Sequence, residues 1–551
     1  MKYLLLFSLL FSTLLFAQDY EAHKYENNTF KIIHIEDDDI YRVGLTNGGK
    51  DFFYKSSQGE DLAKVQLTEG STKCRGFYYR DGFFYSVNVE NEVTQINIIL
   101  KKINKNLEII EERTIFSKPP SSIKHSGKTY FDYNENGFVL AHDYTSRIKV
   151  RFEVFTYDFN TDKLTYNDTT FLSRRNLKVM DFEISDQLNS AFIFDADEPI
   201  GTLKLKTLKD LETYLVYNQK EGALSVLKLT EDENYFERSF NAAFNGEELL
   251  MANLNFNNPS NILDGYTIKK YASHNESSLN MLQASFFPLE DFANREEWGP
   301  ASKDAQKNYK KDKDNKNTDF EAFAAMEISD LIIENEEAII IVREVFDMVN
   351  TQANSGTSVH GSPINGAHRT QQSALATQNY TTKRFKEFQI TKVDLDTEKV
   401  LWWNRLYNMP YTNGAYNAEK VSQGDYFWTN QNVSRASKVY YSYQKGNDLV
   451  LLYPTYSALY NKNGYLESDI VNQRPFVPLK FLTYSFIGKT EINLSNGEVE
   501  NSLHISDYDG LGKMISATII NLDAFYSDNE VLVTPIEHLL KKISVLKIVD
   551  K

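Results

Sequence analysis

The chain has 551 residues, of which 41% are hydrophobic, 25% charged and 13% aromatic, an ordinary composition for a soluble globular protein with a large core. Its 34 Tyr and 36 Phe favour strands over helices. The net charge of −16 and the scattered Lys and Arg residues argue against nucleic acid as a partner.

Residues 1–17, MKYLLLFSLLFSTLLFA, combine one positive charge, a short apolar core and a small residue at Ala17. This pattern predicts a secretory signal peptide whose removal leaves Gln18 first, so we expect a periplasmic or secreted protein. The ending LLFAQ resembles exports from the Bacteroidota. No later stretch reaches 18 consecutive apolar residues, so we expect no transmembrane span in the mature chain.

Residues 18–29 are predicted as a polar lead-in, and a strand-rich domain is predicted from residue 30 to residue 551. Short apolar runs alternate there with turns rich in Asn, Asp and Gly. One kind of turn recurs every 53–57 residues in the first half, at Asp81, Asn136, Asn189 and Gly246. Four strands and their turns fill such a period, which is typical of one blade of a β-propeller.

Cys74 is the only cysteine, so the secreted chain has no internal disulfide and depends on its core for stability. We interpret Cys74 as a small buried hydrophobic residue rather than a reactive nucleophile.

A second recurring unit is a hairpin with an Asx-rich turn. The clearest copy is FQITKVDLDTEKVLWWNR at residues 388–405, a near copy is FEVFTYDFNTDKLTY at 152–166, and a weaker one is EINLSNGEVE at 491–500. A repeated hairpin that cannot bury both faces by itself indicates a repeat architecture.

Two polar segments interrupt the second half, and we predict surface insertions at residues 295–318 and 350–382. Residues 319–330 are predicted as a short helix between them. Thr534, Pro535 and Glu537 form a helix-start signature, which predicts a short C-terminal helix followed by a last strand at residues 544–549. We expect that last strand to close a ring by pairing with residues 30–35.

The hairpin at residues 393–402 resembles the repeat of quinoprotein-type (PQQ-like) propellers, which reads apolar-x-Asp-x-x-Thr-Gly-Lys-x-x-Trp. Asp394, Thr397, Lys399 and Trp402 match, whereas Glu398 stands at the glycine position. In the copy at 158–166, Asp158, Thr161 and Lys163 match, with Asp162 for Gly and Tyr166 for Trp; the third copy keeps Gly497. The resemblance implies a propeller whose Trp packs between blades. It places no quinone site, and we predict no cofactor.

Several polar clusters are candidates for sites, and for each we favour a structural interpretation. His360 and His368 lie in a segment rich in Gly and Pro rather than on a rigid frame, so we predict no metal site there. The acidic stretch 312–319 lacks the Gly and Glu of a calcium loop, and Asp507 to Gly510 is interpreted as a turn. The dense acids at 37–39 and 195–198 are also interpreted as solvated turns.

The aromatic blocks at residues 77–85, 402–403 and 440–443 offer two interpretations, core packing or stacking surfaces for glycans. We favour packing. No nucleophile elbow, zinc helix, phosphate loop or Cys-x-x-Cys motif occurs, and the catalytic residues, if any, are unknown.

Taken together, the sequence predicts an all-β protein, a β-propeller of about seven or eight irregular blades with a short C-terminal helix. The alternative architecture is two β-rich domains divided near residues 295–320. The expected function is non-enzymatic binding or scaffolding, in which a face of the ring engages a protein or a glycan in the cell envelope or outside the cell. The alternative is a carbohydrate-active hydrolase with close, buried carboxylates of raised pKa in the propeller channel.

Overall fold

The computed structural model forms strands and turns throughout the residues that it describes. These are residues 20–25, 30–37, 39–45, 50–57, 60–92, 94–120, 129–145, 149–172, 176–197, 213–222, 224–229, 235–257, 262–274, 278–288, 326–334, 336–351, 379–406, 441–455, 486–505, 522–527, 530–537 and 542–549.

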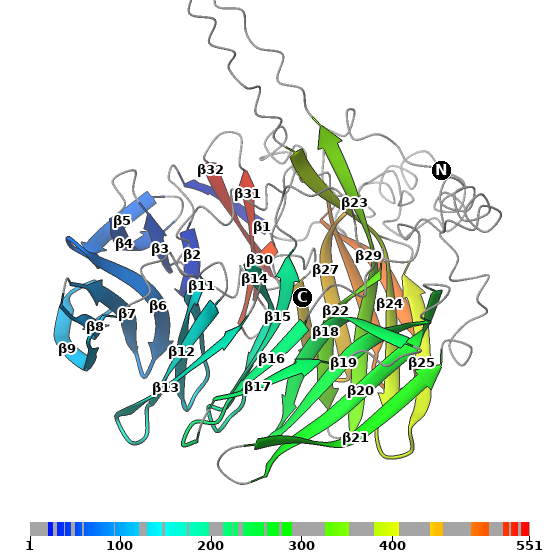
Figure 1. Cartoon of the computed structure of the whole chain (residues 1–551). Helices are drawn as coiled ribbons and strands as arrows, with labels where there is room; N and C mark the ends of the chain where they lie inside the picture. Colours follow the sequence, from blue (N-terminus) through cyan, green and yellow to red (C-terminus); the bar gives the residue numbers. More distant parts are fainter. Residues whose placement is uncertain are drawn as a thin grey trace, which may run out of the picture.

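The described strands form eight antiparallel sheets of four strands, which follow one another along the chain and are arranged as a ring (Figure 1). The first three contain β2 (Phe30–Glu36), β3 (Asp39–Leu45), β4 (Asp51–Ser57) and β5 (Glu60–Gln66); β6 (Thr72–Arg80), β7 (Phe83–Asn91), β8 (Ile96–Ile103) and β9 (Ile109–Lys118); and β10 (Thr129–Tyr133), β11 (Gly137–Thr145), β12 (Lys149–Asp158) and β13 (Lys163–Leu172). The next two contain β14 (Asn176–Ile184), β15 (Ser190–Asp197), β16 (Thr213–Asn218) and β17 (Leu224–Leu229); and β18 (Tyr235–Asn245), β19 (Glu248–Asn257), β20 (Ile262–His274) and β21 (Ser278–Pro288).

The last three sheets contain β22 (Met326–Glu334), β23 (Glu337–Thr351), β24 (Asn379–Asp394) and β25 (Lys399–Leu406); β26 (Tyr441–Lys445), β27 (Asp448–Thr455), β28 (Phe486–Asn493) and β29 (Val499–Ile505); and β30 (Leu522–Ser527), β31 (Glu530–Glu537), β32 (Lys542–Val549) and β1 (Tyr20–Tyr25). In each of the first seven sheets the four strands are consecutive in the chain. The first strands of successive sheets lie against one another around the ring, and β30 returns to β2. Successive four-stranded meanders closed in this way are a β-propeller, here with eight blades.

The closing sheet combines both ends of the chain, but not with the expected partner. β1 pairs with β32, with Tyr20 opposite Ile548, whereas residues 30–36 form β2, the first strand of the first sheet. Residues 20–25, predicted as part of a lead-in, are therefore part of the propeller. Among the described strands of this sheet, β1 is the outermost.

The predicted C-terminal helix is wrong. Thr534, Pro535 and Glu537 lie in β31, where Pro535 stands opposite Leu522 at the end of the β30–β31 pairing. Proline is tolerated in a strand where its missing N–H breaks no hydrogen bond in the middle of the sheet. Residues that resemble a helix start can therefore also lie at the end of a strand pairing. Met326 to Asp330, the end of the other predicted helix, belongs to β22.

The predicted insertions are described only in part. Residues 295–318 lie outside the described residues. The 350–382 insertion overlaps a strand pair, because β23 and β24 remain paired as far as Thr351 opposite Asn379, and residues 352–378 lie outside the described part.

The core lies between neighbouring sheets rather than within any one of them. The sheets on either side of residues 295–320 share one apolar cluster, in which Leu254, Tyr266 and Phe287 pack with Ile328 and Ile340. This shared core excludes a boundary between two domains at that place. Another cluster joins β22–β25 to β26–β29, with Ile341 and Trp402 against Leu451 and Ile492. Each sheet therefore buries its faces against its neighbours.

The three hairpins recognised in the sequence each join the third and fourth strands of a sheet, β12–β13, β24–β25 and β28–β29. The first side chain of each turn caps the turn. The Asp394 carboxylate accepts the backbone N–H groups of Asp396 and Thr397 at 2.9 and 2.8 Å, and these bonds lower the pKa of Asp394. Asp158 holds Asn160 and Thr161 in the same way at 2.7 and 3.2 Å. The short Asx side chain explains why the motif needs Asp or Asn there.

The glycine position of the repeat is the position of positive φ. Gly497 has φ 74°, and Asp162 and Glu398, which replace glycine, have φ 56° and 54°. Each of these two side chains reaches the outer strand of the preceding sheet. Asp162 pairs with Arg113 of β9, and Glu398 accepts from Ser285 of β21 at 2.8 Å. The contacts between sheets offset the strain that a non-glycine residue has in this conformation.

Trp402 packs between blades, as the resemblance implied. Its Nε1 donates to the Leu494 carbonyl at 3.2 Å, and its ring lies over Gly497 of the following sheet. Tyr166 does not take the same place, because it packs on Phe116 of the preceding sheet. The pairing of β24 with β25 has a register shift between Lys392 and Val393. Because of this shift Trp402 points toward the following sheet, and Trp403 packs against the preceding one.

Candidate functional site

Several of the sequence candidates lie outside the described residues. They are the pair His360 and His368, the acidic stretch 312–319, the turn 507–510, residue 440 of the third aromatic block, and Asp38 and Glu198 of the two acidic clusters. Asp195 and Asp197 lie in strand β15 rather than in a turn. Asp37 is in the β2–β3 turn with φ 53°, and Asp39 pairs with Lys55 at 2.7 Å. Among the described residues, no group of three or more His, Cys, Asp or Glu side chains could hold a metal ion.

Cys74 is buried, as expected. Its thiol donates to the Gly76 carbonyl at 3.4 Å, and burial raises the pKa of the thiol well above its ordinary value. The side chain therefore has the inert character of a core residue.

The buried acids of the described residues are held by amides, by bases or, at Asp143, by the Tyr130 hydroxyl at 2.8 Å. Asp51 accepts the Cys74 N–H at 2.8 Å, and burial raises its pKa to about 6. Asp181 accepts the Ala242 N–H at 2.7 Å. Glu153 is fully buried between Lys118 and Arg151, whose Nε lies 3.0 Å from Glu153 Oε1. Each of these acids joins adjacent sheets or adjacent strands.

The aromatic block 77–85 proves to be both core and surface. Phe77, Tyr78 and Phe84 are buried, whereas Tyr79, Phe83 and Tyr85 are half-buried. The difference follows from the β6–β7 hairpin, whose turn at Asp81 and Gly82 brings both strands to one face of the ring. The turns between first and second strands and between third and fourth strands share this face, which we call the turn face.

On the turn face, Tyr78 is the centre of a cluster of rings from two blades. Its ring stacks on Tyr85 with centroids 4.9 Å apart and an angle of 8° between the planes. It also contacts Tyr133 of β10 at 5.6 Å and Phe159 of the β12–β13 turn at 4.9 Å. Tyr133 is 39% exposed and Phe159 is half-buried. We call Phe83, Tyr85, Tyr133 and Phe159, with the underlying Tyr78, the aromatic surface.

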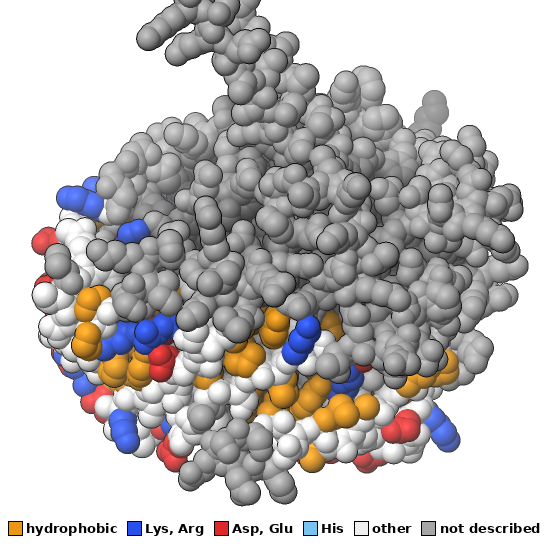
Figure 2. Space-filling view, viewed as in Figure 1, with side chains coloured by type: hydrophobic (Ala, Val, Ile, Leu, Met, Phe, Trp, Pro, Cys, Tyr) orange, Lys and Arg blue, Asp and Glu red, His pale blue; other side chains and the backbone are white. Residues whose placement is uncertain are grey.

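Basic side chains border the aromatic surface. The Arg80 guanidinium lies 4.5 Å from the Phe159 ring centre, and Lys102 Nζ lies 4.0 Å from that of Phe83. Arg80 also pairs with the exposed Asp81 at 3.1 Å. In these cation–π contacts the bases lie over the rings, so one face of Phe159 and one face of Phe83 are already covered. Figure 2 shows apolar and basic side chains side by side over this part of the molecule, on the left.

A clamp between the same two blades fixes the outer side of the surface. Arg113 of β9 donates to both carboxylate oxygens of Asp162 at 2.6 and 2.5 Å and to the Tyr157 hydroxyl at 2.6 Å. The bonds from Arg113 and Tyr157 lower the pKa of Asp162 to about 2. A bidentate pair of this kind is more rigid than a single surface ion pair, so β9 and the β12–β13 turn are locked together.

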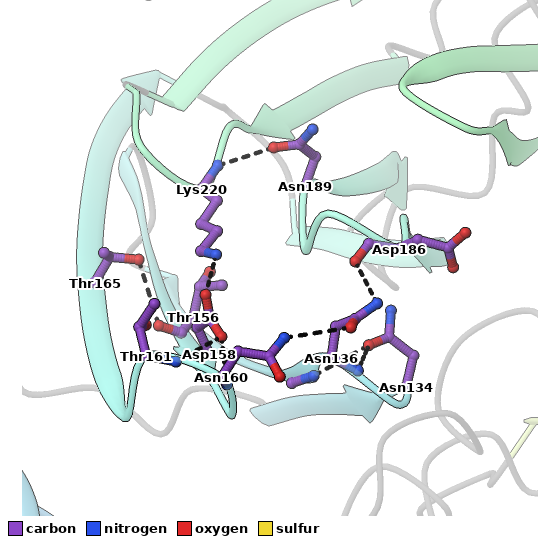
Figure 3. Close-up of polar contacts among 11 residues, drawn as sticks. Asn134, Asn136, Thr156, Asp158, Asn160, Thr161, Thr165, Asp186, Asn189 and Lys220 are labelled. Carbon is purple, nitrogen blue, oxygen red and sulfur yellow. Dashed lines mark hydrogen bonds and ion pairs between the residues drawn. The ribbon is translucent and has the colours of Figure 1, made fainter.

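A polar network continues along the turn face to the next blade (Figure 3). Asn134 and Asn136 donate to the carbonyls of Ser185 and Asp186 at 2.9 and 3.0 Å. Lys220 of the β16–β17 turn forms an ion pair with Asp158. Three successive blades are therefore joined at this face through their turns, so the aromatic surface rests on a rigid support.

Sequence reasoning included Phe83 and Tyr85 in a block but missed Tyr133 and Phe159. A signal exists for Phe159. It follows the capping Asp158, at the position where the other hairpins have Leu395 and Leu494, both buried. Only the fold brings Tyr133, Phe159 and the β6–β7 hairpin together.

No protein-family model and no curated protein matches the chain. Among solved structures, the chain is similar to the WD40 domain of SCAP from fission yeast, with 8% identity, a TM-score of 0.37, and coverage of 97% of this chain and 98% of that one. It is also similar to the phage phi92 endosialidase (10% identity, TM-score 0.24, 89% and 70% covered) and the Cellvibrio cellulosa α-L-arabinanase (9%, 0.21, 46% and 95%). These similarities are distant, and the fold is established by the strand topology. In the described part of the chain no helix has the length and apolarity of a membrane span.

Proposed function

We propose that the protein is an exported, non-enzymatic binding protein that holds a glycan, or failing that a segment of a protein, on the aromatic surface of its turn face. The observation that carries the proposal is the exposed Tyr133 ring, which lies against buried Tyr78 beside Phe159 and Arg80. Export is proposed from the apolar segment at residues 1–17.

Carbohydrate is the ligand class that this surface fits best. The exposed Tyr133 ring, which lies against Tyr78, offers an apolar surface to the C–H groups of a sugar, while the Tyr hydroxyls and Arg80 offer hydrogen bonds at the edge. The supporting rings and the Arg113–Asp162 clamp hold these groups in place before any ligand arrives. Preorganisation of this kind reduces the entropy lost on binding.

The quinoprotein-like repeat supports this proposal as a structural motif. The residues that match the repeat act within the fold: Asp158 and Asp394 cap turns, and Trp402 packs between sheets. The hydrolase alternative would need two acids facing one another. The buried acids of the described residues instead each have an amide, a hydroxyl or a base as a partner; these acids are Asp51, Asp143, Glu153, Asp158 and Asp181. Binding is therefore the function we favour.

The test is binding of the mature chain to a panel of soluble oligosaccharides, measured by calorimetry, alongside assays for their hydrolysis. Tyr133→Ala should weaken binding about tenfold, since losing about 55 Å² of buried apolar ring surface costs about 1.4 kcal/mol. The matched control is Phe52→Ala, a half-buried ring on β4 outside the aromatic surface, which should bind normally. Equal binding by both variants would refute the assignment of the site, and turnover would favour the hydrolase.

A further inference from the structure

The outermost strand of the fifth sheet, β21, differs from the outer strands of the other seven sheets. It has 11 residues, SLNMLQASFFP, and none is charged. Every other outer strand carries at least one Lys, Arg, Asp or Glu; these are β1, β5, β9, β13, β17, β25 and β29. Charges on edge strands prevent pairing with other chains, and β21 lacks this protection, although it has a register shift at Leu282 and ends in Pro288.

β21 also exposes large apolar side chains. Met281 is 56% exposed, Leu282 54% and Phe286 44%, and together they are three of the eight large apolar side chains that are exposed among the described residues. A group of apolar side chains is visible in the lower middle of Figure 2, in front of β17 to β21. Clustering of this kind on one strand distinguishes an interaction surface from scattered exposed residues.

The strand is held firmly on its inner side. It pairs with β20 from His274 opposite Ser278 to Gly265 opposite Pro288. Gln283 and Ser285 donate to Glu398 in the next blade at 3.0 and 2.8 Å. Among the described strands β20 is the only one paired with β21, so no described strand takes up the backbone donors and acceptors of its other edge. Such an edge is recognised by the backbone of another extended strand.

From these observations we infer that β21 pairs antiparallel with β21 of a second copy of this chain, forming a continuous sheet across a twofold axis. The net charge of −16 opposes contact between two copies over most of their surface, and β21 offers an uncharged strip where they can meet. An antiparallel pair of identical strands is self-complementary, so the edge backbone groups and the exposed side chains of both copies are covered at once. This interface lies apart from the aromatic surface and is independent of the proposed function.

The experiment is sedimentation of the mature chain over a range of concentrations, which should show a monomer–dimer equilibrium. Leu282→Lys should weaken dimerisation about thirtyfold, since both copies lose burial of a leucine and gain a like charge in the interface. The control is Leu62→Lys on β5, because Leu62 is 57% exposed on an outer strand that already carries charges. It should dimerise like the unmodified chain.

Hydrogen exchange gives a second measurement. The amides of β21 should gain protection as the concentration rises, while those of β5 should not. A chain that remains monomeric at all concentrations would overturn the inference. So would a dimer that Leu282→Lys leaves intact, or one that forms without protection of β21.

Discussion

The contact between Trp402 and Gly497 predicts a large and separable loss of stability for Gly497→Ala. Gly497 has φ 74°, and a Cβ added there would lie 2.6 Å from Trp402 Cδ2. The left-handed backbone costs a non-glycine residue about 1–2 kcal/mol, and overpacking against a buried ring costs about 1–3 kcal/mol more. We therefore expect the free energy of unfolding to fall by about 2–5 kcal/mol, measured by urea unfolding followed by circular dichroism.

Two further variants separate the backbone effect from the contact. Gly82 has φ 78° with no atom within 4 Å of an added Cβ, so Gly82→Ala should lose only the backbone contribution of about 1–2 kcal/mol. In a Trp402→Leu background, the cost of Gly497→Ala should fall to that same value, because the ring is gone. Equal losses for Gly497→Ala and Gly82→Ala would refute the argument that Trp402 packs tightly between the blades.

Three other predictions follow from buried groups. Burial raises the pKa of Asp51 to about 6 from its ordinary 3.8, so the folded chain favours the protonated acid and loses about 2 kcal/mol of stability as pH rises from 4 to 7. Asp51→Asn cannot ionise, so its stability relative to the unmodified chain, measured in urea, should rise by about that amount between pH 4 and pH 7, and a constant difference would contradict the raised pKa. Cys74 is buried with a raised pKa, so a thiol reagent should label it only as fast as the chain unfolds, and rapid labelling under native conditions would exclude its burial. Glu153→Leu should cost about 3–5 kcal/mol because Lys118 and Arg151 lose a buried partner, and adding Lys118→Met should recover part of that loss in a thermal melt; a double variant less stable than the single one would contradict the pairing.

The repeat unit could be predicted from the sequence because its causes are local. The turn markers at Asp81, Asn136, Asn189 and Gly246 all fall between first and second strands, and the three Asx hairpins fall between third and fourth strands. Short capping side chains and turn residues need only their own backbone, so a single sequence records them. The four-stranded period and the fold class were therefore confirmed, with the blade number fixed at eight.

What could not be predicted depended on distant parts of the chain. Thr534 and Pro535 have a local preference for a helix start, and pairing with Leu522 and its neighbours overrides it. Residues 20–25 are polar and short, and only β32 makes them a strand. The aromatic surface likewise combines Tyr85, Tyr133 and Phe159 from three separate turns or strands. Their spacing along the chain does not predict that they lie together.

The pairing of β1 with β32 sets an order of events during biosynthesis. Tyr20 stands opposite Ile548, so β1, the first of the described strands to be synthesised, cannot pair until β32, the last of them, has been made. The other seven sheets are each complete within a short length of chain and can form as it emerges, whereas the final sheet requires nearly all of it. Contacts so distant in sequence form slowly. A ribosome that stops early would thus release an open arc whose first and last sheets each have an uncovered apolar face, and exposed surface of this kind promotes aggregation.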